Sequence, residues 1–246
     1  AGDTNGHADV FVRRLSAATT ARVSVAGDGS QANGGSDYCG PSVSADCRYV
    51  AFASHASNLV AGDTNGHADV FVHDLVSGET TRVSRMPDGS QPTRDCSCPS
   101  LSADGRFVAY DTALNPLSSG SRVYLHDRVS GQTQLVATPV DVDTRRPAMS
   151  ASGNVVAFMS YTRGSVPGDV YDDRLWLFDR QTGTTRELAR TGSSSDVIDI
   201  AGTPAVSGDG RWVAFASSVA LAGADTNREA DVFLQDTVTG ETSLIS

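Results

Sequence analysis

The sequence predicts an all-β fold assembled from repeated units. Three observations predict it: an internal repeat, a turn-rich composition and short strand patterns between the turns. The chain has 246 residues with 24 Gly and 9 Pro, which is long enough to bury a sizeable core. Of its 29 acidic residues, 25 are Asp and only four are Glu. Because Asp favours turns and caps while Glu favours helix interiors, we expect most of the acids in loops.

Two sequence blocks recur along the chain. The first occurs four times, as PSVSADCRYVAFAS from Pro41, PSLSADGRFVAYDT from Pro99, PAMSASGNVVAFMS from Pro147 and PAVSGDGRWVAFAS from Pro204. The second occurs five times, as DVFVRRLSAATTARVS from Asp9, DVFVHDLVSGETTRVS from Asp69, RVYLHDRVSGQTQLVA from Arg122, RLWLFDRQTGTTRELA from Arg174 and DVFLQDTVTGETSLIS from Asp231. The chain therefore holds four whole repeats, preceded by the back half of another.

Each whole repeat predicts four strands in order. In the first repeat these are 41–44, 48–54, 69–74 and 80–84, separated by a tight turn, a long loop and an Asp-x-x-Ser/Thr-Gly turn. Four antiparallel strands in about 50 residues is the size of one propeller blade. The predicted fold class is therefore a β-propeller of four-stranded antiparallel blades, with four complete blades plus a half blade.

Two sets of repeated residues have structural interpretations. The prolines are expected to start the first strand of each repeat, where a missing N–H is tolerated; they are Pro41, Pro99, Pro147 and Pro204. The aspartates before the last turn of each repeat are expected to accept hydrogen bonds from the turn amides; they are Asp74, Asp127, Asp179 and Asp236. We assign neither set to a functional site.

The repeated pattern resembles the TolB-like (WD40-like) β-propeller repeat family. The resemblance rests on P-x-[VLM]-S-x-[DS]-G-[RN]-x-V-A-[FY], followed by an apolar strand and D-x-x-[ST]-G, and it covers essentially the whole chain. Propellers of that family serve as partner-binding platforms, substrate gates and sensor domains alike. The resemblance therefore implies the fold and leaves the function open.

We expect one propeller domain over residues 1–246, with repeat units 1–40, 41–98, 99–146, 147–203 and 204–246. Both ends of the chain fall within a repeat, because Ala1 aligns with Ala61 in a loop and Ser246 aligns with Ser84 after a strand. Either the ring closes as five blades or the chain is a fragment of a propeller with six or more blades. The fragment is favoured, because a missing inner strand exposes unpaired backbone groups.

Charge and hydropathy narrow the class of partner. The net charge of −10 disfavours nucleic acid and anionic membrane surfaces, which are bound by basic patches. No apolar run approaches the roughly 18 residues of a membrane helix, so we expect no membrane insertion. Cations are the more compatible partners.

The long loops are the predicted place of function. In an up-and-down blade, the loops between repeats and the loops within each repeat's middle lie on one face, and here both sets are long and variable. That face is expected to bind a protein or carbohydrate ligand of unknown identity. Two of the loops between repeats share the sequence DGSQ, at 28–31 and 88–91, which is also common in ordinary polar turns.

An acidic motif in these loops predicts calcium sites. The pattern Asp-x-Asn-x-x-x-Asp supplies three side-chain oxygens at alternating positions, as hard cations require. The predicted ligands are Asp3, Asn5 and Asp9; Asp63, Asn65 and Asp69; and Asp225, Asn227 and Asp231. The motif lacks a terminal bidentate Glu, so weak affinity is expected. An alternative stays open, since Asp and Asn before Gly form Asx-turns without any metal.

The four cysteines suggest one disulfide bond and a location in an oxidising compartment. Cys39 precedes the first strand of one blade, and Cys96 and Cys98 lie at the matching place in the next, so a disulfide between adjacent blades is predicted. Cys47 lies in a turn on the opposite face. A disulfide and weak calcium sites both suit an exported protein, at the cell surface or in the periplasm.

The sequence carries none of the common catalytic signatures. G-x-S-x-G, H-E-x-x-H, the P-loop and the dinucleotide-binding fingerprint are all absent. The favoured hypothesis is a non-catalytic binding or scaffold module stabilised by calcium. The alternatives are a propeller hydrolase or lyase, and the substrate-gating domain of a larger peptidase.

Overall fold

The computed structural model describes residues 2–36, 39–112, 121–138, 143–161, 173–190, 200–222 and 229–246. Every regular element in these ranges is a β-strand, so they contain no helix that could cross a membrane. The all-β prediction is therefore confirmed.

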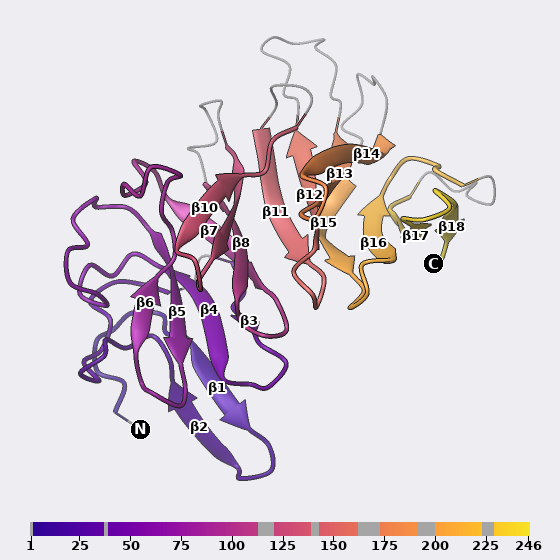
Figure 1. The fold of residues 1–246 in the computed structure, drawn as a ribbon. Helices are drawn as coiled ribbons and strands as arrows, with labels where there is room; N and C mark the ends of the chain where they lie inside the picture. Colours follow the sequence, from indigo (N-terminus) through magenta and orange to yellow (C-terminus); the bar gives the residue numbers. More distant parts are fainter. Residues whose placement is uncertain are drawn as a thin grey trace. The chain divides into compact units, whose positions relative to one another are not determined.

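The strands form one two-stranded and four four-stranded sheets, each an antiparallel meander that follows chain order (Figure 1). The hairpin contains β1 (Phe11–Arg14) and β2 (Thr19–Arg22). The first two blades contain β3 (Ser42–Val43), β4 (Tyr49–Ser54), β5 (Asp69–Asp74) and β6 (Thr80–Arg82), then β7 (Cys96–Leu101), β8 (Phe107–Thr112), β9 (Val123–Asp127) and β10 (Gln132–Leu135). The other two contain β11 (Asp143–Met149), β12 (Val155–Tyr161), β13 (Arg174–Asp179) and β14 (Thr184–Arg190), then β15 (Ile200–Val206), β16 (Trp212–Ser217), β17 (Asp231–Asp236) and β18 (Thr242–Leu244). The predicted half blade and four blades are confirmed.

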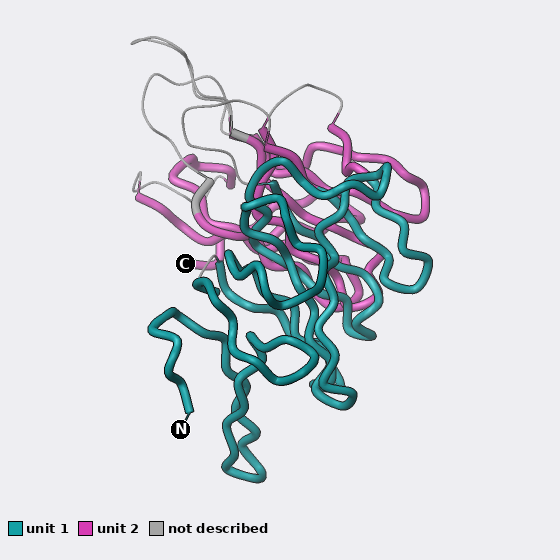
Figure 2. The backbone as a smooth tube through the Cα atoms, turned by 90° about the vertical axis from the view of Figure 1, so that its left-hand side faces the viewer, with its two compact units in different colours: residues 1–113, 124–134 teal, residues 114–123, 135–246 magenta. Residues whose placement is uncertain are grey.

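The chain divides into two compact units (Figure 2). Unit 1 comprises residues 1–113 and 124–134, and it contains the β1–β2 hairpin, the first blade and most of the second. Unit 2 comprises residues 114–123 and 135–246, and it contains the third and fourth blades.

The core of unit 1 lies between successive sheets, because the middle strands alternate between two packing faces. In β4, Val50 and Phe52 pack with residues of the β1–β2 hairpin, whereas Ala51 and Ala53 pack with residues of the second blade. A strand with period-two side chains that is buried on both faces must be apolar throughout, and all of 50–53 are. In unit 2, Phe215 and Phe233 belong to the corresponding cluster.

The last turn of each blade has the aspartate contacts that the sequence predicted. In the first blade, Asp74 Oδ1 accepts a hydrogen bond of 2.8 Å from the amide of Val76, and Gly78 takes the left-handed φ of 77° that closes the turn. Arg48 binds the same carboxylate through Nε and Nη2, and it holds the pKa of Asp74 well below its ordinary value. Arg106–Asp127 and Arg211–Asp236 repeat the arrangement. These aspartates therefore fix turns, as predicted.

The prolines of the last three blades do not start their strands, which corrects the prediction. Pro99, Pro147 and Pro204 lie inside β7, β11 and β15, and in each strand the pairing register shifts across the proline. A bulge leaves a residue out of the hydrogen-bonded ladder, so the missing N–H of proline costs nothing there. Pro41 alone precedes its strand, which begins at Ser42.

Candidate functional site

The acidic loop before β5 is held together by its own side chains. Asp69 is buried, and its Oδ1 accepts a hydrogen bond of 2.5 Å from Ser84 while its Oδ2 accepts one of 2.9 Å from Asn65 Nδ2. Asn65 Oδ1 in turn accepts the amide of His67 at 3.0 Å. The Asn therefore closes an Asx-turn and donates to the Asp, and burial raises the pKa of the Asp69 carboxyl despite these bonds.

An arginine lies between the two carboxylates of this loop. Arg82 Nη1 is 3.3 Å from Asp63 Oδ1 and 3.7 Å from Asp69 Oδ2. Both aspartate side chains are almost fully buried. A guanidinium thus neutralises the pair of acids from inside the fold.

The loop before β1 has the same connections in a looser form. Ser24 and Asn5 donate to the two oxygens of Asp9, at 2.5 and 3.1 Å. Arg22 lies 3.6 Å from both Asp3 and Asp9, but the Asp3 side chain is 45% exposed. The repeated sequence motif therefore builds the same hydrogen-bonded loop twice.

The third predicted copy is described only in part. Asp225 and Asn227 lie outside the described residues. Asp231 accepts a hydrogen bond of 2.8 Å from Ser246, and its buried Oδ2 makes no hydrogen bond to any described residue. Within the described part of the chain, no group of three or more His, Cys, Asp or Glu side chains converges as metal ligands would. Calcium binding stays a prediction for all three copies.

The DGSQ loops connect to the acidic loops through their glutamines. Gln91 Nε2 donates to Gly62 O at 3.0 Å and to Thr64 Oγ1 at 3.1 Å, while its Oε1 accepts from Arg82. Gln31 makes the matching contacts to Gly2 and Thr4. Each pair of long loops is thereby cross-braced on the same face of its blade.

The cysteines differ in their environment. Cys39 and Cys98 form a disulfide, which links the approach to β3 with β7 of the next blade. Cys96 is a buried thiol whose pKa is raised well above its ordinary value by burial, and Cys47 is an exposed thiol. Of the three cysteines considered for the bridge, Cys96 is therefore the one left out.

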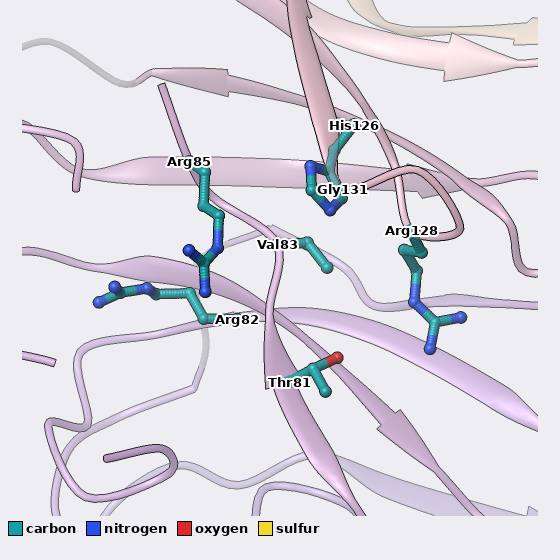
Figure 3. Close-up of a pocket in the computed structure, with 7 residues that line it drawn as sticks. All are labelled: Thr81, Arg82, Val83, Arg85, His126, Arg128 and Gly131. Atoms are coloured by element: carbon teal, nitrogen blue, oxygen red, sulfur yellow. The ribbon is translucent and has the colours of Figure 1, made fainter. Parts of the chain in front are cut away.

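A pocket in unit 1 contains residues that the sequence analysis did not select. Its volume is 310 Å³, and it is lined by Thr81, Arg82, Val83, Arg85, His126, Arg128 and Gly131 (Figure 3). The first four residues come from β6 and the segment after it, and the others come from the end of β9 and the turn that follows. In Figure 3 the Arg82 side chain leads away from the others. Its Nη1 forms the ion pair with Asp63 described above. No motif flags this set, because its two halves are more than 40 residues apart in sequence.

A hydrogen-bond network lies beside the pocket. Tyr110 Oη donates to Arg85 O at 2.7 Å and accepts from Arg85 N at 3.2 Å, and it also bonds to Thr133. His126 Nδ1 lies 2.9 Å from Thr133 Oγ1. Burial, with the positive charge of Arg85 as a smaller cause, lowers the pKa of His126 to about 4. The imidazole is therefore neutral at pH 7.

Comparison with known proteins identifies the fold. No family model and no curated protein matches the sequence. Among solved structures, TolB from Acinetobacter baumannii is similar over 96% of this chain and 48% of its own, with 17% identity and a TM-score of 0.54. An oligogalacturonate lyase in complex with manganese is similar over 96% of this chain and 58% of its own, with 16% identity and a TM-score of 0.62. An oligogalacturonate lyase from Vibrio parahaemolyticus is similar over 97% and 60%, with 12% identity and a TM-score of 0.61.

The likeness at these identities concerns the fold. The chain spans roughly half to three-fifths of the length of these proteins, and its sheets have the size of complete propeller blades. The strand order within each sheet and the recurring turns agree with the sequence pattern described above. The chain therefore has the fold of the TolB-like β-propellers.

Proposed function

We propose that this chain is a binding module that holds a protein or carbohydrate partner on the face formed by its long loops. The observation that carries the proposal is the cross-bracing of those loops by Gln31 and Gln91. A loop that is already fixed loses little conformational entropy when it binds, so a braced polar surface suits recognition.

The exposed groups of the braced loops support a polar partner. Thr4, Thr64 and His7 are exposed. The glutamine that contacts each threonine also donates to a backbone carbonyl, of Gly2 or of Gly62. Hydroxyl, imidazole and carbonyl groups can bond sugar hydroxyls or a peptide backbone. The internal ion pairs of Asp63 and Asp69 serve this role as structural supports, whether or not calcium joins them.

An exported location is part of the proposal. The disulfide between Cys39 and Cys98 supports it, because such bonds persist in oxidising compartments and are rare in the cytosol. Alkylation in denaturant without a reductant, on the protein taken directly from its source, should label the two thiols of Cys47 and Cys96. Labelling of all four would contradict an oxidising location.

The proposed binding face can be tested with a matched pair of variants. Gln31→Ala with Gln91→Ala removes the braces, whereas Val76→Ser with Val129→Ser alters two exposed residues of the tight turns. Wild type and both variants are applied to a panel of immobilised polysaccharides and secreted proteins. We expect the glutamine variant to bind at least tenfold more weakly and the valine variant to bind as wild type. Equal binding by the two variants would refute the proposed face, and turnover of a polysaccharide would favour the lyase alternative.

A further inference from the structure

We propose that the pocket between the first and second blades is a binding site for a compact anion, one whose carboxylate or phosphate oxygens contact Arg85 and the facing residues His126 and Arg128. The proposal does not depend on the long-loop face. It rests on three features of the pocket: its unpaired guanidinium, its fixed second cation, and its contrast with the neighbouring blade junction.

Arg85 supplies the unpaired charge. Its side chain is exposed at the pocket, and its guanidinium makes no hydrogen bond or ion pair with any described residue, although its backbone is held from both sides by Tyr110. In contrast, Arg82 on the same segment is neutralised by Asp63 and Asp69. An unpaired guanidinium on a fixed backbone can form a bidentate pair with a planar or tetrahedral anion.

The opposite wall is already oriented. Arg128 Nη1 donates to Gly105 O at 2.6 Å, and its guanidinium lies 4.3 Å from the centre of the Tyr49 ring. These contacts fix the side chain and leave further N–H donors on the guanidinium. His126 is buried with Nδ1 engaged by Thr133, so Nε2 is the ring atom available to a ligand. Figure 3 shows Arg85 and Arg128 on opposite sides of Val83, with His126 above it and Thr81 below it.

The uncompensated positive charge argues for an anion. Burial is the main cause of the lowered pKa of His126, and the positive charges of Arg85 and Arg128 lower it further while Asp127 acts in the opposite direction. No acidic side chain lines the pocket, although the chain as a whole carries a net charge of −10. A bound anion would offset the charge of the guanidinium groups that line the pocket, and the pocket volume of 310 Å³ suits a small ion or a small organic acid.

The preceding blade junction shows that the propeller does not need these arginines. There the histidine–threonine pair recurs, with His73 Nδ1 at 2.9 Å from Thr80 Oγ1. In the aligned repeats, Val25 takes the place of Arg85 and Leu75 takes the place of Arg128. The two arginines are thus additions to a junction that folds with apolar residues.

Titration calorimetry with inorganic phosphate and with citrate tests the site, at constant ionic strength in sodium chloride. Arg85→Val introduces the residue found at the neighbouring junction, so the variant should fold, which circular dichroism checks. Arg85→Gln is a second variant that keeps a polar side chain. We expect wild type to bind one or both anions saturably, and both Arg85 variants to bind at least tenfold more weakly. The preferred anion distinguishes a phosphate from a carboxylate ligand.

The matched control is Arg14→Val, which removes one exposed arginine from β1 in the same unit. It should bind as wild type, because its charge lies outside the pocket. Arg128→Leu should weaken binding less than the Arg85 variants, since its guanidinium already bonds to Gly105. The proposal is refuted if wild type shows no saturable binding of either anion, or if Arg85→Val and Arg14→Val bind equally.

Discussion

The two blade junctions of unit 1 share one plan and differ in polarity. The first junction packs the β1–β2 hairpin against the first blade, and the second packs the first blade against the second. Both carry a buried histidine bonded to a threonine, His73 with Thr80 and His126 with Thr133. In the first junction Phe52 packs against Phe71, whereas in the second Tyr110 stacks on Tyr124.

The two junctions also differ in the donor that binds the backbone carbonyl after the outermost strand, which is the carbonyl of Val25 in the first and of Arg85 in the second. At the first junction Thr80 Oγ1 donates directly to Val25 O, at 2.5 Å. At the second, Tyr110 Oη donates to Arg85 O. At both junctions a partly buried carbonyl therefore accepts a side-chain hydroxyl, although the donor comes from a different residue. In the aligned repeats, the second junction has Tyr110, Arg85 and Arg128 where the first has Phe52, Val25 and Leu75.

The disulfide gives the largest expected difference between the junctions, because only the second is spanned by the bond between Cys39 and Cys98. The bond closes a loop with a sequence separation of 59 residues. Cys39→Ser with Cys98→Ser should lower the free energy of unfolding by about 4 kcal/mol, since the unfolded chain regains loop entropy. Urea unfolding measures the change, with Cys47→Ser as the control. A loss equal to that of the control would show that the bond does not form.

The two acidic loops give the next largest difference. Asp63→Ala should cost about 2 kcal/mol, because its side chain is only 3% exposed and Arg82 would lose a buried partner. Asp3→Ala should cost less than about 1 kcal/mol, because Asp3 is 45% exposed. Urea unfolding compares the two variants, and similar losses would contradict the difference in burial.

The same two loops allow a test of the calcium prediction. A calcium ion at either loop would have to take oxygens that now contact Arg22 or Arg82. The melting temperature should be higher in calcium than in EGTA, and Arg22→Met should make this difference larger than it is in wild type. If the melting temperature of both proteins is the same with calcium and with EGTA, the motif forms Asx-turns and binds no calcium.

The hydroxyl groups of Tyr110 and Thr80 should contribute about equally to the free energy of unfolding. Tyr110→Phe removes the donor to Arg85 O, and Thr80→Val removes the donor to Val25 O. Each change should lower the free energy of unfolding by about 1 kcal/mol, because a partly buried carbonyl loses its hydrogen bond. Thr81→Val, which removes only a long contact of 3.4 Å to Val72 O, is the control and should cost less. Equal costs for all three would contradict the proposed roles.

The last prediction concerns pH. His126 has a pKa of about 4 in the fold and about 6.5 when unfolded, so protonation favours the unfolded chain and stability falls as the pH drops from 6.5 to 4. His126→Gln, which introduces the residue that blade four has in Gln235, should flatten this pH dependence. Arg85→Val should raise the pKa of His126 only slightly, because burial is the larger cause. Urea midpoints at pH 4.5 and 7 and NMR titration measure both effects.

The sequence by itself determined the repeats, the strands and the turns. These features depend on local rules: the alternation in 50–53, the glycine at the left-handed position of the last turn, and Asp74 bonding to amides two and three residues ahead. Each interaction joins residues that are close in sequence or adjacent within one sheet. A repeated pattern therefore specifies them four times over.

Tertiary structure alone decided which side chains meet across sheets. The acidic motif indicated ligand oxygens, but Arg82 reaches the loop from another strand, and Asn65 donates its amide N–H to Asp69. The pocket likewise joins Arg85 to His126 and Arg128, whose segments have no common motif. Which faces of successive blades pack together depends on the summed twist and bulges of the sheets, including those at Pro99, Pro147 and Pro204. The spacing of residues in the sequence does not predict these contacts between sheets, so the site can be identified only from the folded structure.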